Sequence, residues 1–312
     1  MSTEISVAMA AYNGEKYIIR QLESILDQTR KVHEIVIFDD CSTDNTKAVI
    51  DKFICENKLQ DIIDFRVNDK NLGYASNFMR AIDKSRGDYI FFCDQDDIWT
   101  ENRVEKMLSV MEENPKIGLL GSEFLPFKSS IDAPKVPGWE LSKFKNDGSI
   151  EKLEFNSESI FIGCQGCTMV IRRSFFEEIR PFWYEGWAHD EFAWKLALSM
   201  DKLFFYHEIT LKRRLHSDNV TLHKEHKKEQ RLKYLKDLKK SHEMTLEFIK
   251  EKCHSDTKEY RIKLMKRHIR ATDLRIELIE DKKPVNSLKM LFYTDCYHKK
   301  RSIPVELIMA LR

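Results

Sequence analysis

The sequence feature that most restricts the fold of this chain is a regular alternation of apolar, β-prone runs with amphipathic helical segments. Strands are predicted at residues 5–10, 34–38, 65–67 and 88–93, and helices around 18–26 and at 46–57 and 74–84. The run at 34–38 is apolar almost throughout, as expected of a strand that is covered on both faces. Because strands that alternate with helices usually pair in parallel, the sequence predicts an α/β fold with a mainly parallel central sheet flanked by helices.

Polar groups follow three of these strands at the point where each strand ends. Tyr12 follows the first strand, Asp39 and Asp40 follow the second, and residues 94–97 follow the fourth. Ligands of open parallel sheets bind beyond the carboxyl ends of the strands. The sequence therefore predicts a site for a nucleotide-type ligand with a metal ion at this edge of the sheet.

The segment Asp94-Gln95-Asp96-Asp97 places three acids within four residues, directly after an apolar run. Like charges at this density indicate a compensating cation, and carboxylate oxygens are ligands that a hard divalent ion prefers. The alternative is an acidic loop in which Asp96 or Asp97 caps the following helix. We expect that helix to begin at Asp97-Ile98-Trp99.

Charge is distributed unevenly along the chain. Residues 1–223 carry 28 Lys+Arg and 37 Asp+Glu, a net charge of −9, whereas residues 224–312 carry 24 and 14, a net charge of +10. The apolar runs are all shorter than the roughly 20 residues that span a bilayer, and the N-terminus enters a strand pattern directly, so we expect a cytoplasmic protein. Cys164 and Cys167 have no second Cys/His pair at zinc-site spacing, which favours reduced, structural thiols.

Three motifs together resemble a known family. They are Ala11-Tyr12-Asn13-Gly14, Asp39-Asp40-Cys41-Ser42-Thr43-Asp44 and Cys93-Asp94-Gln95-Asp96-Asp97-Ile98-Trp99. In this order they resemble the bacterial family 2 glycosyltransferases with the GT-A fold, over roughly residues 3–222. The third motif is similar to the rhamnosyltransferase-like branch, which builds cell-wall and capsular polysaccharides.

The resemblance also implies a domain organisation. A GT-A catalytic domain would occupy residues 1–223, with a nucleotide-sugar half at about 1–122 and an acceptor half at about 123–223. A basic helical C-terminal region would occupy residues 224–312.

Five residues are implied to line the nucleotide of a nucleoside diphosphate sugar. They are Ala10, Tyr12, Asp40, Asn71 and Asp94. Tyr12 would stack on the base, Asp40 would accept a hydrogen bond from the imide N–H of the base, and Asp94 would contact the ribose or a metal-bound water. The residues alone leave simpler interpretations open, with Tyr12 packed on the following helix and Asn71 in an ordinary turn.

Asp96 and His216 are the metal ligands that the resemblance implies. Asp96 would hold Mg²⁺ or Mn²⁺ between the two phosphates, and the ion would stabilise the charge of the departing nucleoside diphosphate. His216 belongs to a motif at 211–220 that is similar to the family's Tyr-Arg-x-His-x-x-Asn-Val ending, in which Arg213 or Arg214 would neutralise phosphate charge. A lone surface histidine is the alternative for His216.

Asp190 is the implied general base of an inverting transfer, which takes the proton from the attacking hydroxyl. It follows His189 at a predicted helix start, and Glu191 is its nearest competitor. Without the resemblance, the N-cap of that helix is the simpler interpretation of Asp190. The chain departs from the commoner family pattern at His189 and Lys195, which leaves the phosphate-side contacts open.

Three later segments carry further expectations. Residues 160–171 are predicted to form a strand, a turn and a second strand, and the irregular region at 126–158 suits acceptor binding. Apolar positions recur along the basic segment 224–312, which predicts amphipathic helices. These helices would lie on an anionic membrane, where a lipid-linked acceptor is found, or pack against the catalytic domain or a second subunit.

The sequence thus predicts an inverting, metal-dependent glycosyltransferase. Its donor would be dTDP-rhamnose or a UDP-hexose, and its acceptor a saccharide or lipid-linked saccharide. The alternative is another nucleotide-utilising enzyme such as a sugar nucleotidyltransferase, which would usually show a Gly-rich phosphate loop with a basic residue after the first strand. The acidic body of the chain argues against nucleic acid as a partner of the basic tail, and a homo-oligomer is compatible with its apolar positions.

Overall fold

The computed structural model describes residues 3–136, 138–217, 227–283, 285–298 and 302–311. The chain divides into two compact units, which we call the sheet unit and the helical unit. The sheet unit comprises Met1–Lys152, Gly163–Trp194 and Lys202–Leu222, and the helical unit comprises Leu153–Ile162, Lys195–Asp201 and His223–Arg312. Two short segments from the middle of the chain therefore belong with the C-terminal helices.

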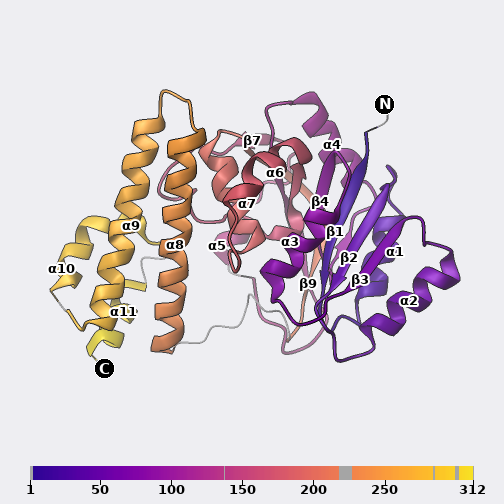
Figure 1. Cartoon of the computed structure of the whole chain (residues 1–312), viewed down its shortest axis with the longest axis horizontal. Coiled ribbons are helices and arrows are strands. Elements are labelled where there is room, and N and C mark those ends of the chain that lie inside the picture. Colours follow the sequence, from indigo (N-terminus) through magenta and orange to yellow (C-terminus); the bar gives the residue numbers. More distant parts are fainter. Residues whose placement is uncertain (1–2, 137, 218–226, 284, 299–301, 312) are drawn as a thin grey trace. The chain divides into compact units, whose positions relative to one another are not determined.

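The first part of the sheet unit alternates strands and helices as predicted (Figure 1). Its elements are β1 (Ile5–Ala11), α1 (Ile18–Leu26), β2 (Glu34–Asp39), α2 (Thr46–Asn57), β3 (Ile63–Val67), α3 (Tyr74–Lys84), β4 (Tyr89–Asp94), β5 (Ile98–Trp99), α4 (Arg103–Glu113) and β6 (Leu119–Lys128). The elements that follow are α5 (Gly138–Leu141), β7 (Ile150–Lys152), η1 (Gly166–Thr168), β8 (Val170–Arg172), α6 (Arg173–Ile179), η2 (Arg180–Phe182), α7 (His189–Ser199) and β9 (Leu203–Leu215).

These strands form one nine-stranded sheet with the order β3-β2-β1-β4-β8-β6-β9-β5, and β7 pairs with β9. The pairs among β1, β2, β3 and β4 are all parallel, which confirms the prediction from the alternating pattern. Beyond β4, the pairs that involve β5, β7 and β8 are antiparallel, whereas β6 and β9 are parallel. The fold is therefore α/β, with a parallel half followed by a mixed half.

The strand register brings the carboxyl ends of β1, β2 and β4 to the same edge. Ala10 on β1 lies opposite Phe38 of β2 on one side and opposite Asp94 of β4 on the other. Just past the strand ends, the backbone N–H of Asp40 donates to the carbonyl of Ala11 at 2.8 Å. The loops that follow these three strands therefore begin side by side.

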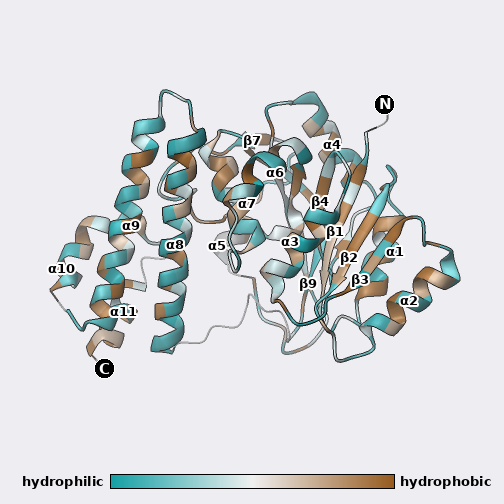
Figure 2. Ribbon diagram, in the orientation of Figure 1, coloured by the Kyte–Doolittle hydropathy of each residue, from teal (hydrophilic) through white to brown (hydrophobic). Residues whose placement is uncertain are grey.

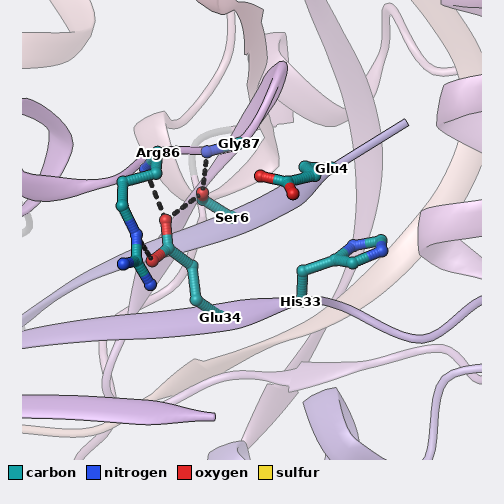
Figure 3. A pocket seen from close by; sticks show the side chains of 6 residues that line it. All are labelled: Glu4, Ser6, His33, Glu34, Arg86 and Gly87. Carbon is teal, nitrogen blue, oxygen red and sulfur yellow. Dashed lines mark hydrogen bonds and ion pairs between the residues drawn. The ribbon is translucent and has the colours of Figure 1, made fainter. Parts of the chain in front are cut away.

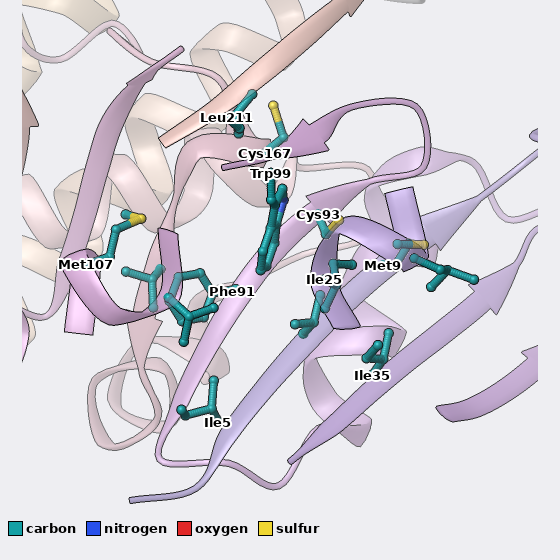
Figure 4. Packing of buried hydrophobic residues seen from close by; sticks show 14 of the residues in the cluster. Ile5, Met9, Ile25, Ile35, Phe91, Cys93, Trp99, Met107, Cys167 and Leu211 are labelled. Carbon is teal, nitrogen blue, oxygen red and sulfur yellow. The ribbon is translucent and has the colours of Figure 1, made fainter. Parts of the chain in front are cut away.

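An apolar core beneath this edge keeps the strand ends in place. The rings of Phe91 and Trp99 are both buried, with their centroids 5.5 Å apart. Figure 4 shows them with Ile5, Met107 and other members of the cluster, and Figure 2 shows hydrophobic colouring along β1, β2 and β4. Because each fully buried side chain of this size contributes about 1.5–3 kcal/mol, the acidic loop after β4 begins from a rigid strand.

Two sequence-based expectations are wrong. No helix begins at Asp97, because Ile98 and Trp99 instead form β5, which pairs with Lys212 and Leu211 of β9, and α4 begins only at Arg103. Residues 160–165 form turns and bends instead of the first of two strands. The second strand, β8, lies between β4 and β6, so neither of its edges is free to pair with the segment that precedes it.

The helical unit consists mainly of two long helices, α8 (Lys228–Lys252) and α9 (Lys258–Glu280), which pack against each other. They are followed by α10 (Asn286–Met290), η4 (Leu291–Cys296) and α11 (Ser302–Leu311). Leu274 and Leu278 are two of the recurring apolar positions of the basic segment, and they pack with Met290, Tyr297 and Ala310 inside this unit. These two apolar positions are therefore used for packing within the unit. Of the helices that the structure describes, none is both long and apolar enough to cross a bilayer.

Lys195, one of the departures from the family pattern, belongs to the helical unit. Its side chain is buried and its ammonium group donates to the hydroxyl of Ser241 at 2.7 Å. Nδ1 of His242 lies 3.3 Å from the same ammonium nitrogen. Within this unit, Lys195 therefore joins the end of α7 to α8.

Candidate active site

The two predicted metal ligands meet at the carboxyl edge of the sheet. Asp96 lies two residues after the end of β4, and His216 follows the end of β9. Nε2 of His216 lies 2.7 Å from Oδ2 of Asp96, and both side chains are largely buried. Residues that are far apart in the sequence thus form one pair beside the acidic loop.

Asp94 and Asp97, the other two acids of the loop, lie close to other side chains and are poorly solvated. Burial raises the pKa of Asp94 to about 7, with a further contribution from the charge of Asp96. Burial and the charge of Asp96 also raise the pKa of Asp97 well above its usual range. Ligand atoms of Asp94, Asp97 and Cys167 all lie within 4.8 Å of one another. Carboxyl groups with raised pKa values are those whose ionised forms a bound cation would stabilise.

The residues present fit a hard divalent cation. Carboxylate oxygens suit Mg²⁺ or Mn²⁺, an imidazole nitrogen suits Mn²⁺ better than Mg²⁺, and a thiol suits neither ion. Burial raises the pKa of the Cys167 thiol well above its usual value, so it stays protonated. Asp97 already accepts the backbone N–H of Arg214 at 2.9 Å. Asp96 and His216, with Asp94 beside them, are therefore better suited to hold the ion than the group that contains Cys167.

Asp40 is buried under the loop that contains Asn71. Its Oδ1 accepts the backbone N–H of Leu72, and its Oδ2 accepts that of Gly73, both at 2.8 Å. Nδ2 of Asn68 donates to Oδ1 at 2.8 Å, and Nδ2 of Asn71 donates to the carbonyl of Asp40 at 3.0 Å. A carboxylate has about four acceptor sites, so three donors leave little capacity for the imide of a base. In this structure Asp40 positions the loop of Asn71.

Tyr12 is 47% exposed on the loop after β1, next to half-buried Ala10. The side-chain amide of Gln95 fixes its backbone, accepting the N–H of Tyr12 at 2.9 Å and donating to its carbonyl at 2.8 Å. The exposed ring fits stacking on a base better than packing in the protein. Gln95 is the variable residue of the acidic motif, and no sequence pattern predicts this contact.

Asp190 lies in the first turn of α7, which begins at His189, and its Oδ1 accepts the backbone N–H of Glu191 at 2.8 Å. Burial raises the pKa of Asp190 to about 6, an effect that this hydrogen bond partly offsets. The charge of Asp190 also raises the pKa of Asp94, which shows that the two carboxyl groups interact electrostatically. The structure thus brings Asp190 toward the acidic loop.

Gly166 allows the start of α7 to come this close. A Cβ at position 166 would lie 2.8 Å from Nε2 of His189 and 3.1 Å from Cβ of Asp190. The ring of His189 cannot easily move away, because it is buried and stacked on Phe78 with centroids 3.8 Å apart. Burial lowers the pKa of His189 to about 3, so this neighbour stays neutral and adds no positive charge beside Asp190.

A polar pocket lies at the opposite ends of the strands (Figure 3). It is lined by Glu4, Ser6, His33, Glu34, Arg86 and Gly87. Ser6 donates to Glu34 at 2.6 Å and accepts the backbone N–H of Gly87 at 2.7 Å, so these groups satisfy one another. None of the predicted site residues lines this pocket, and we assign the active site to the carboxyl edge.

The fold matches structures of GT-A glycosyltransferases. The structure of residues 1–349 of TarS from Staphylococcus aureus in complex with UDP superposes with a TM-score of 0.64 at 15% identity, covering 98% of this chain and 89% of that one. The mannosyltransferase PcManGT from Pyrobaculum calidifontis, in complex with GDP-Man and Mn²⁺, gives a TM-score of 0.53 at 14% identity over 100% and 86%. The chain therefore has the GT-A fold.

Comparison of the sequence with known proteins identifies the family. The family model "Glycosyl transferase family 2" matches residues 6–180, and the chain belongs to this family. TuaG of Bacillus subtilis, named for teichuronic acid biosynthesis, is 31% identical over 137 residues, which are 42% of this chain and 53% of TuaG. An uncharacterized glycosyltransferase of Haemophilus influenzae is 27% identical over 240 residues, 74% of this chain and 72% of that protein. The match thus spans about half the length of TuaG.

The raised pKa of Asp190 predicts that Asp190→Asn stabilises the fold in a pH-dependent way. The pKa rises from 3.8 to about 6, so the ionised form costs at most about 3 kcal/mol, and we expect about 1–2 kcal/mol because the carboxyl is only half-buried. The cost is fully present above about pH 7 and disappears as pH falls through 6 toward 4.

Urea unfolding of the wild type and Asp190→Asn at pH 8 and pH 4.5 measures this difference. Asn keeps the oxygen that accepts the N–H of Glu191, so lost hydrogen bonding does not obscure the result. Equal stabilisation at both pH values would show that the ionised carboxyl carries no such cost.

Proposed function

We propose that this protein is an inverting, metal-dependent glycosyltransferase that moves a sugar from a nucleoside diphosphate sugar to a saccharide or lipid-linked saccharide. The observation that carries this proposal is the meeting of three groups at one sheet edge: the Asp96–His216 pair, the half-buried Asp94, and Asp190 with its raised pKa. An inverting transfer requires one base and one centre that binds diphosphate, and these residues supply both.

Asp190 is the proposed base. In the reaction the acceptor oxygen attacks the anomeric carbon, the bond from that carbon to the diphosphate oxygen breaks, and the acceptor proton passes to a carboxylate oxygen of Asp190. With a pKa of about 6, Asp190 is ionised at neutral pH and more basic than a free aspartate. Gly166, which carries no Cβ, leaves the room that Asp190 occupies at the start of α7.

Asp96 and His216 are the proposed ligands of Mg²⁺ or Mn²⁺, and Asp94 is proposed to contact the ribose or a metal-bound water. The ion, when bound, would offset the negative charge that develops on the departing diphosphate. The charge of Arg213 lowers the pKa of Asp94, which supports a position of this guanidinium near the same centre. Arg213 is therefore proposed to contribute positive charge on the diphosphate side.

Ala10, Tyr12 and Asn71 are the remaining proposed nucleotide contacts. Tyr12 has the exposure needed for stacking, and Asn71 belongs to the loop that Asp40 holds. The structure favours Asp40 as a positioning residue of that loop over a direct contact to the base, although its remaining acceptor capacity is compatible with one.

The relatives support the choice of substrates. TuaG is named for teichuronic acid biosynthesis, one TarS structure contains UDP-GlcNAc, and PcManGT was solved with GDP-Man and Mn²⁺. We propose a UDP-hexose or dTDP-rhamnose as donor, and cell-surface polysaccharide synthesis as the pathway. A sugar nucleotidyltransferase is less well supported, because the family model that matches is a glycosyltransferase model.

Membrane contact is proposed for one exposed row of the helical unit. Leu288, Leu291 and Phe292 are 64%, 59% and 77% exposed and recur at helical spacing through α10 and η4, with exposed Lys289 among them. Apolar residues beside lysine suit the anionic inner face of a cell membrane, where a lipid-linked acceptor would be met. A second copy of the chain is the alternative partner of this row.

The double variant Leu288→Ser with Phe292→Ser is expected to lose at least half of the binding to vesicles that contain anionic lipid, measured by co-sedimentation. Tyr260→Ser, which alters a residue 52% exposed on α9, is the control and should bind as the wild type does. Wild-type protein that fails to sediment with anionic vesicles, or a double variant that still binds fully, would refute the membrane proposal.

The proposed reaction predicts release of nucleoside diphosphate from one member of a donor panel. The purified protein is incubated with UDP-, dTDP- and GDP-sugars, with Mn²⁺, with Mg²⁺ or with a chelator, and the released diphosphate is measured. We expect turnover with one base class and its loss on chelation. Absence of both turnover and binding with every donor would refute the proposed function.

Asp190→Asn is expected to lower kcat at least 1,000-fold while the Kd of the donor changes less than about threefold, because the base acts only in the chemical step. Wild-type kcat should fall as pH drops through about 6, where Asp190 becomes protonated. Glu191→Gln is the matched control, with expected activity within about fivefold of wild type. An active Asp190→Asn beside an inactive Glu191→Gln would assign the base to Glu191.

A further inference from the structure

Arg214 contacts the acidic loop twice from the end of β9. Its Nε donates to the backbone carbonyl of Asp96 at 2.8 Å, and its backbone N–H donates to Oδ1 of Asp97 at 2.9 Å. Neither contact uses the carboxylate of Asp96, which stays directed at His216. Arg214 thus fixes the backbone from which the proposed metal ligand projects.

Two aromatic rings fix Arg214 in turn. The guanidinium carbon lies 4.5 Å from the ring centroid of Tyr17 and 4.6 Å from that of Phe127. Cation–π contacts of this kind attract the guanidinium to the ring faces and so restrict its position. Tyr17 precedes α1 and Phe127 lies on β6, so three separate parts of the sheet unit meet at this side chain.

Tyr17 also contacts the second proposed ligand. Its ring centroid lies 5.0 Å from that of His216, and its hydroxyl lies 3.4 Å from the hydroxyl of Ser129. One tyrosine ring therefore touches both residues that contact Asp96, namely Arg214 through the cation–π contact and His216 through the ring contact. None of the sequence motifs includes Tyr17 or Phe127.

We propose that Tyr17 and Phe127 act as positioning residues that hold Arg214, and that Arg214 in turn holds Asp96 in its metal-binding orientation. This inference rests on the proposed function, because it assumes that Asp96 and His216 receive the ion. It assigns Arg214 a role distinct from that of Arg213: Arg214 orients the ligand through its backbone, while Arg213 lies toward Asp94. Residues that orient a metal ligand in this way typically alter metal affinity 10–100-fold when replaced.

The test measures Mn²⁺ binding to the full-length protein by electron paramagnetic resonance, without substrate. Arg214→Lys keeps the charge but loses the planar fork, and is expected to raise the Kd for Mn²⁺ about 10-fold or more. Tyr17→Leu should raise it by a similar factor, whereas Tyr17→Phe, which keeps the ring, should stay within about threefold of wild type. Thermal midpoints measured in a chelator should agree within about 3 °C for the variants compared.

Each outcome of this experiment has one meaning. Equal Mn²⁺ affinity in wild type, Arg214→Lys and Tyr17→Leu would overturn the positioning role and leave the glycosyl transfer untouched. Wild-type protein that binds no Mn²⁺, yet releases nucleoside diphosphate in a chelator, would overturn this inference together with the metal site, but not the transfer. A Tyr17→Phe variant that binds Mn²⁺ as weakly as Tyr17→Leu would overturn the role of the ring face and assign the effect to the hydroxyl.

Discussion

Repulsion between acids is the constraint on which the site depends. Asp94, Asp96 and Asp97 follow one strand, and Asp190 approaches them from a helix on a distant part of the chain. The fold compensates this concentration of negative charge only in part, with His216 against Asp96, a backbone N–H on Asp97, and the nearby charge of Arg213. Despite these contacts, burial raises the pKa of Asp94 to about 7, and the charge of Asp96 adds to that rise. A site with this deficit favours a divalent cation, and the proposed chemistry requires one.

The parallel half of the sheet could be predicted from the sequence, and the mixed half could not. In β1, β2 and β4 each strand is an apolar run, and the helix that follows shows its own periodicity, so local pattern and tertiary structure agree. At Ile98 and Trp99 they disagree. The pattern favours a helix start, but pairing with Lys212 and Leu211 converts these two residues into a strand. A partner so distant in the chain leaves no local signal.

The site residues also divide into those with a local sequence signal and those whose contacts depend on distant parts of the chain. Asp94, Asp96 and Asp190 stand in motifs, and the structure brings them to one edge. The carboxylate of Asp40 accepts two backbone N–H groups of the loop at 72–73. Side-chain types alone do not reveal such backbone contacts. Gln95 and Tyr17 are similar cases, because they act through a backbone amide and a ring face instead of a reactive group. The sequence motifs therefore contain the acids that the structure brings to one edge, but do not indicate the groups that hold them.

The missing side chain at Gly166 has a consequence for how variation in this family should be interpreted. Every amino-acid replacement of glycine adds at least a Cβ, and here that atom would press on His189 and Asp190 together. In a deep mutational scan, position 166 should therefore look as intolerant as the proposed base, Asp190. Intolerance to substitution would then not distinguish a residue that takes part in proton transfer from a glycine that leaves room for that residue. Alignments of relatives would carry the same ambiguity.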